Sequence, residues 1–330
     1  MKVFTAFRIH QQGKEVKAGF EQLTLDDLTE GDVVIKVSYS GINYKDALAA
    51  TGKGRILRTS PLNGGIDLTG RIVRSQDPAF QAGDSVLVCG CGLSETRDGG
   101  YAEYARVPSC CVVKVPEGLT EFETMVIGTA GFTAGLAVQR LQDNGQTPEM
   151  GPILVTGATG GVGSLAINML SQLGYEVVAL TGKMAQEAYL KSLGASRLLD
   201  RHTLEMGNKP MEKATWGGAV DSLGGQTLSW LTRTVKPWGS IASIGLAQGW
   251  EVQTTVMPFI LRGVSILGIN SIEMPVAVRQ HVWGRLGEDL RPSKMETIGG
   301  KTIGFKELPA AFGDYMSANV VGRTVVSIGK

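Results

Sequence analysis

The sequence predicts an α/β protein of two domains, one mostly β and one built on a doubly wound parallel sheet. The chain has 330 residues, whereas a single hydrophobic core seldom grows beyond ~250–300 residues. Short apolar strands alternate with helical segments between residues 152 and 270, as in parallel sheets with helical crossovers. The first of these strands runs into a glycine-rich turn that opens a helix, an order typical of doubly wound folds.

The first third of the chain reads as short strands divided by Gly and Pro. The candidate strands are residues 33–42, 67–75, 84–91, 101–108 and 110–116. In the first of them, apolar and polar residues alternate in the early part, and β-branched residues are present. This spacing is typical of a compact, mostly β domain.

The character of the chain changes near Glu121. Residues 122–142 are long, apolar and free of proline, so they predict a helix with Thr120 as its N-cap. Residues 301–330 carry a short helix and a closing strand, and their composition resembles that of the N-terminal part. We therefore expect a discontinuous first domain, residues 1–122 with 301–330, and a second domain over residues 123–300. The strands expected in the second domain are residues 152–156, 176–181, 197–200, 218–223, 239–245 and 264–270.

Composition and charge exclude several classes of partner. Hydrophobic residues make up 43% of the chain, charged residues 19%, and the net charge is +1, which gives no electrostatic case for nucleic acid or an anionic membrane. The N-terminus has no apolar stretch of signal-peptide length, and no run approaches the ~20 apolar residues of a spanning helix. The four cysteines are too few and too closely spaced for a disulfide framework. We expect a cytoplasmic protein.

The strongest local signal is the turn that follows the strand at 152–156. A glycine trio alone is weak evidence, but here a strand precedes it and a helix follows it. Gly157 and Gly160 would let the backbone turn tightly and approach a pyrophosphate, and Gly163 would let the helix pack close to the sheet. The N–H groups at the start of the helix would hold the anion. The predicted dinucleotide cradle consists of Gly157, Thr159, Gly160, Gly161, Val162 and Gly163. The alternative is a glycine-rich turn without a ligand.

The end of the second strand discriminates between NADH and NADPH. An NAD enzyme usually carries an Asp or Glu there for the ribose 2′-hydroxyl, but this strand ends in Thr181, Gly182 and Lys183, and the next acid is Glu187. A 2′-phosphate would be bound by Thr181 and Lys183, with Arg201 after the third strand as a second cation. The sequence therefore predicts NADPH as the cofactor. In the alternative, both cations are solvated surface charges.

Four motifs, GINYKDALAATG, PLNGGIDLTG, the ATGGVG turn at 158–163 and GINS at 268–271, resemble the medium-chain dehydrogenase/reductase superfamily. They agree with it in order and spacing, and the resemblance covers essentially the whole chain. Within the superfamily the chain resembles the zinc-independent, quinone-oxidoreductase-like branch, and in it the subgroup of bacterial NADPH-dependent acrylyl-coenzyme A reductases. The resemblance implies a GroES-like, mostly β catalytic domain beside a Rossmann-type NADPH-binding domain.

The same resemblance implies that no zinc is bound. Where zinc members of the superfamily carry a Cys and a His, this chain has Asn43 and Tyr44; Ile66 and Ala130 replace two further ligands, and the acid at Asp67 is kept. The structural cysteine quartet is also absent. The residues alone give the same result, because the three histidines are widely scattered and the cysteines occur only as close pairs. The predicted metal content is none.

Without a metal to act as a Lewis acid, we expect an acceptor that delocalises its own negative charge. Hydride delivered to an unsaturated thioester or a quinone gives an enolate or a phenolate, which hydrogen-bond donors stabilise. The best prediction for this small-molecule substrate is acrylyl-CoA, reduced to propionyl-CoA. The alternatives are an NADPH:quinone oxidoreductase and a non-catalytic NADPH-binding redox sensor.

The catalytic candidates are Tyr44 and Asn43. Tyr44 takes the place of a zinc ligand, so we expect it to donate a proton or position the nicotinamide; the alternative is an aromatic packed on the cofactor ring. Asn43 would donate to the developing oxyanion or only cap a turn. For Asp67 we expect a structural salt bridge with Lys45 or Arg71.

Further residues are expected near the cofactor or the substrate. Thr129 would touch the nicotinamide ribose, and Asn319 matches a family position near the cofactor, with a surface turn as its alternative. The carboxyl edge of the sheet contributes Leu246, Ile269, Asn270 and Ser271. The basic loop with Lys53, Arg55 and Arg58 would meet the phosphates of a coenzyme A ester, or is only solvated. The resemblance also implies a homodimer paired through the strand at 264–270.

Overall fold

The computed structural model describes residues 2–329 and divides into two compact units. The first unit contains the residues up to Thr129, residues 272–288 and the residues from 295 onward, and the second contains residues 130–271 and 289–294. The first unit is thus discontinuous, but its borders differ from those expected at residues 122 and 301. Within residues 2–329 the structure has no helix that is both long and apolar enough to span a bilayer.

The first unit opens with a hairpin that the sequence did not indicate. Strands β1 (Phe4–Gln12) and β2 (Glu15–Leu23) pair antiparallel along their whole length, and β4 (Leu62–Asn63) adds to the other edge of β1. Gly13, with φ of +62°, makes the turn. In β2, Val16, Ala18 and Phe20 alternate with polar residues or glycine, but none of the three is buried, and Leu23 is the one buried residue of this strand.

The larger sheet of the first unit is built around β3 (Val33–Ile42), which has the predicted bounds. It runs in the order β15 (Lys301–Gly304), β16 (Thr324–Ser327), β3, β5 (Asp67–Ser75), β6 (Ser85–Cys89), β8 (Val113–Lys114), with β7 (Tyr104–Val107) also on β3. The helices of this unit are α1 (Tyr44–Thr51), the first part of α2 (Glu121–Asp143), α7 (Val276–Gly287), α8 (Met295–Ile298) and α9 (Leu308–Met316). Because β16 lies between β15 and β3, the end of the chain completes a sheet begun near its start.

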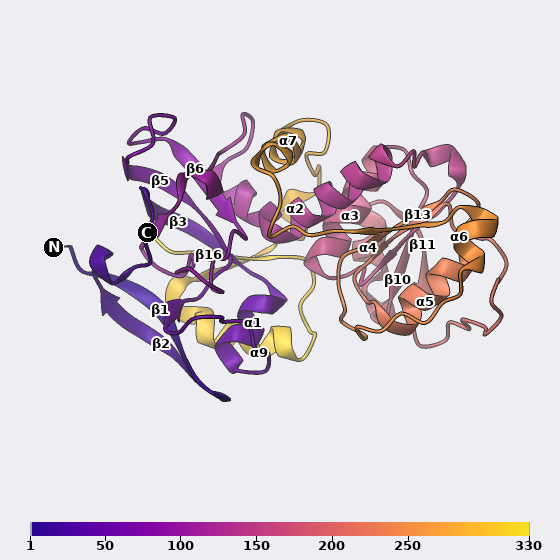
Figure 1. Cartoon of the computed structure of the whole chain (residues 1–330), viewed down its shortest axis with the longest axis horizontal. Helices are drawn as coiled ribbons and strands as arrows, with labels where there is room; N and C mark the ends of the chain where they lie inside the picture. Colours follow the sequence, from indigo (N-terminus) through magenta and orange to yellow (C-terminus); the bar gives the residue numbers. More distant parts are fainter. Residues whose placement is uncertain (1, 330) are drawn as a thin grey trace. The chain divides into compact units, whose positions relative to one another are not determined.

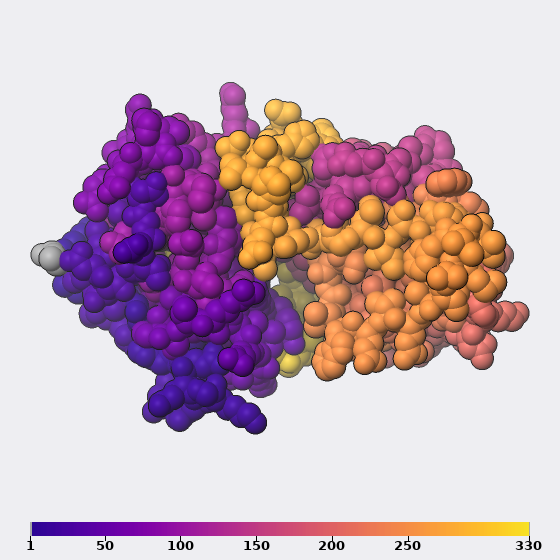
Figure 2. Space-filling view, in the orientation of Figure 1, coloured from indigo at the N-terminus to yellow at the C-terminus, as the bar shows by residue number. Residues whose placement is uncertain are grey.

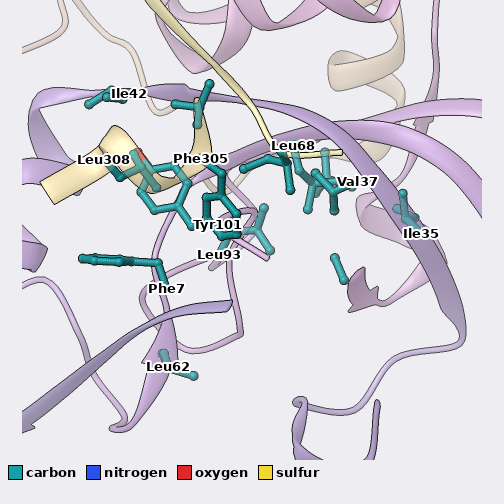
Figure 3. Packing of buried hydrophobic residues seen from close by; sticks show 14 of the residues in the cluster. Phe7, Ile35, Val37, Ile42, Leu62, Leu68, Leu93, Tyr101, Phe305 and Leu308 are labelled. Atoms are coloured by element: carbon teal, nitrogen blue, oxygen red, sulfur yellow. The ribbon is translucent and has the colours of Figure 1, made fainter. Parts of the chain in front are cut away.

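The core of the first unit joins segments that are far apart in the sequence. Figure 3 shows Phe7 from β1, Tyr101 and Leu308 in one layer of buried side chains. The ring centroids of Phe7 and Tyr101 are 6.4 Å apart, and the Tyr101 hydroxyl donates to the Gly41 carbonyl over 3.1 Å. A buried tyrosine needs such a partner for its polar atom, so this bond fixes the ring against β3.

The second unit is a six-stranded parallel sheet of Rossmann type. Its strands are β9 (Ile153–Thr156), β10 (Val177–Thr181), β11 (Ala195–Asp200), β12 (Gly218–Asp221), β13 (Ser240–Ser243) and β14 (Ser265–Gly268), in the spatial order β11-β10-β9-β12-β13-β14. This is the 3-2-1-4-5-6 order of a doubly wound sheet, and each predicted strand is present within two residues at either end. The helices are α3 (Gly161–Gln172), α4 (Glu187–Ser192), α5 (Gly225–Thr234), α6 (Met257–Arg262) and the second part of α2, and Figure 1 shows α3 and α5 on opposite sides of the strands.

Helix α2 explains why the first border lies later than expected. It begins as predicted after Thr120, whose backbone N–H donates to the Glu123 carboxylate over 2.8 Å while its hydroxyl accepts from the Glu123 N–H, a capping box. The helix is broken at Gly128, where φ is +48° and ψ is −159°. A Cβ there would lie 2.7 Å from a carboxylate oxygen of Asp67, so the break requires glycine. The first unit ends at the next residue, Thr129.

The other border differs because residues 272–288 pack on the first unit. Arg279 of α7 is 3% exposed, and its guanidinium donates to the carbonyl of Cys89 at the end of β6 over 2.7 Å. The same side chain also donates to the Ile272 carbonyl over 3.0 Å. These contacts tie α7 to the first unit, which the composition of the segment does not reveal.

Candidate active site

A buried polar cluster lies in the first unit around Asp67, the first residue of β5. The Asp67 side chain is fully buried, and its carboxylate accepts hydrogen bonds from the Asn43 amide over 2.8 Å and from the Thr129 N–H and hydroxyl over 3.0 and 2.5 Å. The guanidinium of Arg323 lies 3.5 Å away as the opposite charge. Since a buried carboxylate is costly unless paired and hydrogen-bonded, these contacts are what allow Asp67 to occupy the core.

Arg323 is 3% exposed, and its side chain joins three parts of the first unit. It donates to the Val126 carbonyl over 3.1 Å, to the Ile42 carbonyl over 3.1 Å and to the Asn43 side-chain oxygen over 2.8 Å. The planar guanidinium suits such a set because its five N–H donors point in fixed directions. The strand β3, helix α2 and the C-terminal segment are therefore held by one side chain.

The predicted partners of Asp67 were wrong. Lys45 forms an ion pair with Glu95, and Arg71 forms one with Glu121 at 3.3 Å. The Arg71 side chain is 63% exposed, so it points away from the buried end of β5. The true partner follows Asp67 by 256 residues, and no local pattern could identify it.

Asn43 is the N-cap of α1 and forms a capping box with Asp46. The Asp46 carboxylate accepts from the Asn43 backbone N–H over 2.8 Å, from the Asn43 amide over 3.1 Å and from the Ile66 N–H over 2.9 Å. Both amide N–H groups of Asn43 are thus directed to carboxylates, one to Asp46 and one to Asp67. This geometry favours the cap over the oxyanion donor, because a substrate would have to compete with a buried anion.

The two buried carboxylates affect each other. The pKa of Asp46 is raised to about 7, mainly by burial and secondly by the negative charge of Asp67. The hydrogen bonds from Asn43 and Ile66 oppose this shift. Asp46 is therefore partly protonated near neutral pH, and a second full negative charge beside Asp67 is avoided.

Tyr44 follows the cap and starts α1, and its side chain is 56% exposed. A ligand can reach it, while the capping box beneath it fixes its backbone. Whether it donates a proton or positions the nicotinamide stays a prediction. Thr129 bonds to Asp67 through both its N–H and its hydroxyl, so its predicted contact with the ribose also stays a prediction.

In the second unit the glycine-rich turn has the geometry of a phosphate cradle. Gly157 has φ of +60°, and the Gly160 N–H donates to the Gly157 carbonyl over 3.0 Å, which closes the turn before α3. A Cβ on Gly163 would clash with the Gly157 carbonyl oxygen and lie 2.8 Å from the Ala158 Cα. The first N–H groups of a helix have no partner within the helix, so the start of α3 offers donors to an anion. The residues fit a dinucleotide pyrophosphate.

Cations lie at the end of β10, beside the turn at Gly182. A Cβ on Gly182 would lie 2.9 Å from the His202 ring nitrogen and 3.3 Å from the Arg201 guanidinium, so both side chains lie against this backbone. The Lys183 N–H donates to the Thr181 hydroxyl over 2.9 Å, and partial burial lowers the pKa of the Lys183 ammonium. His202 was not among the predicted site residues, although it directly follows Arg201 in the sequence.

A pocket of about 560 Å³ adjoins these cations in the second unit. Its lining residues are Arg201, Leu204, Met206, Gly207, Gln226 and Gln248. The volume falls within the range of small-molecule sites, and the lining combines apolar side chains with amides and a cation. Such a lining suits the adenosine part of a dinucleotide.

The remaining predicted residues lie in several places. At the carboxyl edge of the parallel sheet, Ile269 is 9% exposed and its N–H donates to the Ser243 carbonyl over 3.0 Å. Leu246 and Asn270 are exposed, and Ser271 is half-buried at the border of the unit. Asn319 lies exposed in the turn after α9 and its amide donates to the Ser317 hydroxyl over 3.3 Å, which favours the surface-turn alternative. Lys53, Arg55 and Arg58 are exposed in the loop after α1.

The residues at the zinc-ligand positions do not fit that metal. Ile66 and Ala130 offer no side-chain donor atom, and the Asn43 side chain is bonded within the Asp67 cluster. Among residues 2–329 no group of three or more His, Cys, Asp or Glu side chains is arranged to hold a metal ion.

Two family models match the chain. The alcohol dehydrogenase GroES-like domain matches residues 29–117, and the zinc-binding dehydrogenase model matches residues 161–284. Three relatives match nearly the full length. The chain is 45% identical to the putative quinone oxidoreductase YhfP of Bacillus subtilis, with 99% of each chain covered. It is 44% identical to the probable acrylyl-CoA reductase AcuI of Escherichia coli, with 98% of this chain and 99% of the relative covered. It is 41% identical to the acrylyl-CoA reductase AcuI of Ruegeria pomeroyi, with 96% of each covered.

Solved structures of similar proteins also match the chain over nearly its full length. The YhdH oxidoreductase of Salmonella enterica in complex with NADP is 42% identical with a TM-score of 0.95, covering 98% of this chain and 100% of that one. The YhfP protein of Bacillus subtilis with NAD bound is 44% identical, also with a TM-score of 0.95, covering 99% of this chain and 100% of that one. The chain therefore belongs to the medium-chain dehydrogenase/reductase superfamily, in the group that contains the AcuI acrylyl-CoA reductases and YhfP.

Proposed function

We propose that the chain binds NADPH through its second unit and reduces an activated carbon–carbon double bond, with acrylyl-CoA as substrate and propionyl-CoA as product. The observation that carries the choice of cofactor is the turn at Gly182. Arg201 and His202 lie against it, and Lys183 follows it. A 2′-phosphate is an anion that such a group binds through charge-assisted hydrogen bonds.

The relatives support both halves of the proposal. The similar Salmonella structure is a complex with NADP, and two relatives at 41% and 44% identity are named acrylyl-CoA reductases. The similar Bacillus structure contains NAD, so affinity for the two cofactors has to be compared directly. NADPH, when bound, supplies the hydride.

The chain's own residues have separate tasks in this proposal. The glycine turn at the start of α3 holds the pyrophosphate, and the cations beside Gly182 hold the 2′-phosphate. The Asp67–Arg323 pair fixes the backbone that carries Asn43 and Tyr44, so that Tyr44 is presented on α1. Its hydroxyl would donate a proton or hold the nicotinamide in position, and Lys53, Arg55 and Arg58 would meet the phosphates of coenzyme A.

A quinone is the second candidate acceptor, because YhfP, at 45% identity, is named a putative quinone oxidoreductase. NADPH oxidation measured with acrylyl-CoA and with a benzoquinone separates the candidates. We expect faster turnover with acrylyl-CoA and propionyl-CoA as the product by mass spectrometry. Faster turnover with benzoquinone would support the quinone reductase, and tight NADPH binding with neither acceptor reduced would support the redox sensor.

The basic loop allows a sharper test of the substrate. Replacing Lys53, Arg55 and Arg58 by Gln should raise the KM for acrylyl-CoA far more than the KM for benzoquinone, because only the former carries phosphates. Lys14 and Lys17, exposed in the β1–β2 hairpin, are matched control positions. Equal effects on the two substrates would count against binding of coenzyme A by this loop.

We also propose a homodimer paired through β14, the edge strand of the parallel sheet. Large apolar side chains are exposed beside it: Trp238 is 76% exposed, Ile260 is 72% and Leu261 is 64%. Figure 2 shows the segment that contains α6 on the surface of the second unit. Exposed apolar clusters of this kind mark association sites. Light scattering should give twice the chain mass for the wild type and the single mass for Ile260→Asp/Leu261→Asp; a monomeric wild type would contradict the proposal.

A further inference from the structure

Three of the four cysteines meet at one end of β6, in the first unit and outside the residues proposed for catalysis. Strands β6 and β8 pair antiparallel with Leu87 opposite Val113. The end of β6 therefore runs alongside the segment before β8, which contains Cys110 and Cys111. The Cys91 side chain packs against the buried cluster that includes Cys111. The Cys91 and Cys111 thiols are close enough to shift each other's pKa, and Cys110 also affects the pKa of Cys111.

The backbone around Cys91 is unusual. Gly90, Cys91 and Gly92 have φ of +69°, +52° and +79°. A non-glycine residue in this region is held there only when the surroundings over-determine it, and such outliers cluster at functional sites. The turn is fixed by the Leu93 N–H, which donates to the Gly90 carbonyl over 3.0 Å, and by the Gly90 N–H, which donates to the Ile66 carbonyl over 2.9 Å. The Cys91 side chain is consequently presented in one defined position.

The charges around Cys91 favour its thiolate. The hydrogen bond from Cys111 lowers the pKa of Cys91 to about 7, burial opposes this, and the positive charges of Arg279 and Arg97 contribute to the lowering. The hydrogen bond to Cys91 and burial both raise the pKa of Cys111. Cys91 is half-buried and therefore accessible, whereas Cys111 is buried. A low-pKa, accessible thiol next to a second cysteine is the arrangement found in oxidisable cysteine sites.

We propose that Cys91 is the peroxide-reactive thiol of this chain and that Cys111 converts its oxidised form into a Cys91–Cys111 disulfide. In the first step the Cys91 thiolate attacks a peroxide oxygen, the O–O bond breaks, and water leaves after protonation, with a sulfenic acid on Cys91. In the second step the Cys111 sulfur attacks the Cys91 sulfur, the S–O bond breaks, and a second water leaves. Two thiols lose two electrons and two protons, and one hydrogen peroxide becomes two waters.

The geometry and simple exposure predict different first targets, which makes the proposal easy to test. Cys110 is the exposed cysteine and would react first if access alone decided. The full chain is reduced, freed of reductant, treated with hydrogen peroxide, alkylated and digested without reduction. Mass spectrometry should find a cross-link between the Cys91 and Cys111 peptides, two hydrogens lighter than the thiols. Oxidation of Cys110 ahead of Cys91, or disulfides formed mainly through Cys110, would overturn the proposal.

Variants separate the two roles. In Cys111→Ala the sulfenic acid on Cys91 should persist and be trapped by dimedone, whereas Cys91→Ala should give neither the cross-link nor a dimedone adduct on Cys111. Cys110→Ala is the matched control and should keep the cross-link. A dimedone adduct absent from Cys91 in Cys111→Ala would refute the assignment.

A measurement on the wild type keeps the test valid if Cys111→Ala does not fold. A thiol with a pKa of about 7 is about half ionised at pH 7, against about 3% for an ordinary thiol, but its thiolate is less nucleophilic, so the net gain is about threefold. Iodoacetamide should thus alkylate Cys91 about three times faster than an ordinary thiol at pH 7. A Cys91 slower than Cys110 at this pH would contradict the proposal.

Discussion

In the first unit the side chains of Asp67 and Arg323 are 0% and 3% exposed, and they belong to one network of hydrogen bonds. In the second unit, by contrast, Arg201 and His202 are exposed around Gly182. The first group is closed: each charge has its partner within the chain. The second is exposed to solvent: the Arg201 guanidinium lies against the Gly182 backbone, and the Asp200 carboxylate accepts from the His202 backbone N–H over 2.9 Å. The buried pair fixes a backbone, and the exposed group is the one that we propose binds the 2′-phosphate of the cofactor. The comparison suggests that charged side chains neutralised within the chain serve its structure, whereas exposed ones can serve a ligand.

The largest effect is expected from removing one charge of the buried Asp67–Arg323 pair. Arg323→Leu leaves the Asp67 carboxylate buried without a countercharge, which should cost about 3–5 kcal/mol in the free energy of unfolding. Urea denaturation measures this loss. Arg74→Leu is the matched control, since Arg74 is exposed on β5, and it should change stability by no more than about 0.5 kcal/mol. A loss below about 1 kcal/mol for Arg323→Leu would mean that the pair is not needed for stability.

The next effect concerns the cradle in the second unit. Gly163→Ala forces a Cβ against the Gly157 carbonyl and should cost about 1–3 kcal/mol by overpacking, so the turn shifts and NADPH binds about 10–100-fold more weakly. Titration of the cofactor by fluorescence measures this. Gly284→Ala, on α7 with open space around its Cβ position, is the control and should leave the Kd unchanged. Equal affinities for all three proteins would show that the turn does not bind the pyrophosphate.

A smaller effect is expected from removing the exposed Arg201 cation beside Gly182. Arg201→Ala should raise the Kd for NADPH about tenfold, because an exposed charged hydrogen bond is worth about 1.4 kcal/mol, while the Kd for NADH should stay nearly constant. The control is Lys191→Ala, which removes an exposed cation of α4 that pairs with Glu187. Parallel losses for NADH and NADPH would indicate a general effect on the fold rather than recognition of the 2′-phosphate.

The last prediction concerns how steeply the free energy of unfolding changes with pH. Folded Asp46 keeps its proton up to about pH 7, whereas an unfolded aspartate loses it near its ordinary pKa of 3.8. The folded state therefore binds more protons in this window, and the contribution of Asp46 to the free energy of unfolding decreases as pH rises from about 4 to 7. Asp46→Asn should be less stable at all pH values but fall less steeply over this range. If the free energy of unfolding of Asp46→Asn fell as steeply with pH as that of the wild type, a group other than Asp46 would titrate over this range.

The parts of the fold that could be predicted are those with a local pattern. Strands β3 and β5 have the predicted bounds, because each carries its apolar side chains within nine or ten consecutive residues. The glycine turn was predicted from its spacing between a strand and a helix. In the structure Gly157 has φ of +60°, and a Cβ on Gly163 would clash with the Gly157 carbonyl oxygen.

What the sequence could not reveal depends on contacts made only after folding. The β1–β2 hairpin was not predicted, and only Leu23 of β2 is buried. The first border lies at Thr129 instead of residue 122, beside the break at Gly128, where Asp67 and Arg323 leave no room for a Cβ. The partner of Asp67 was wrong for the same reason. For the border at Gly128 and for Asp67, the neighbour that decides the structure is distant in sequence.

The place of β16 between β15 and β3 has a consequence for the order of assembly in the cell. All strands of the second unit have been synthesised by residue 268, whereas the sheet of the first unit lacks an interior strand until residue 327 leaves the ribosome. The inserted unit can therefore fold during translation, although domains generally complete themselves in N-terminal-first order. The nascent first unit has to wait for its final residues, with Asp67 unneutralised until Arg323 arrives.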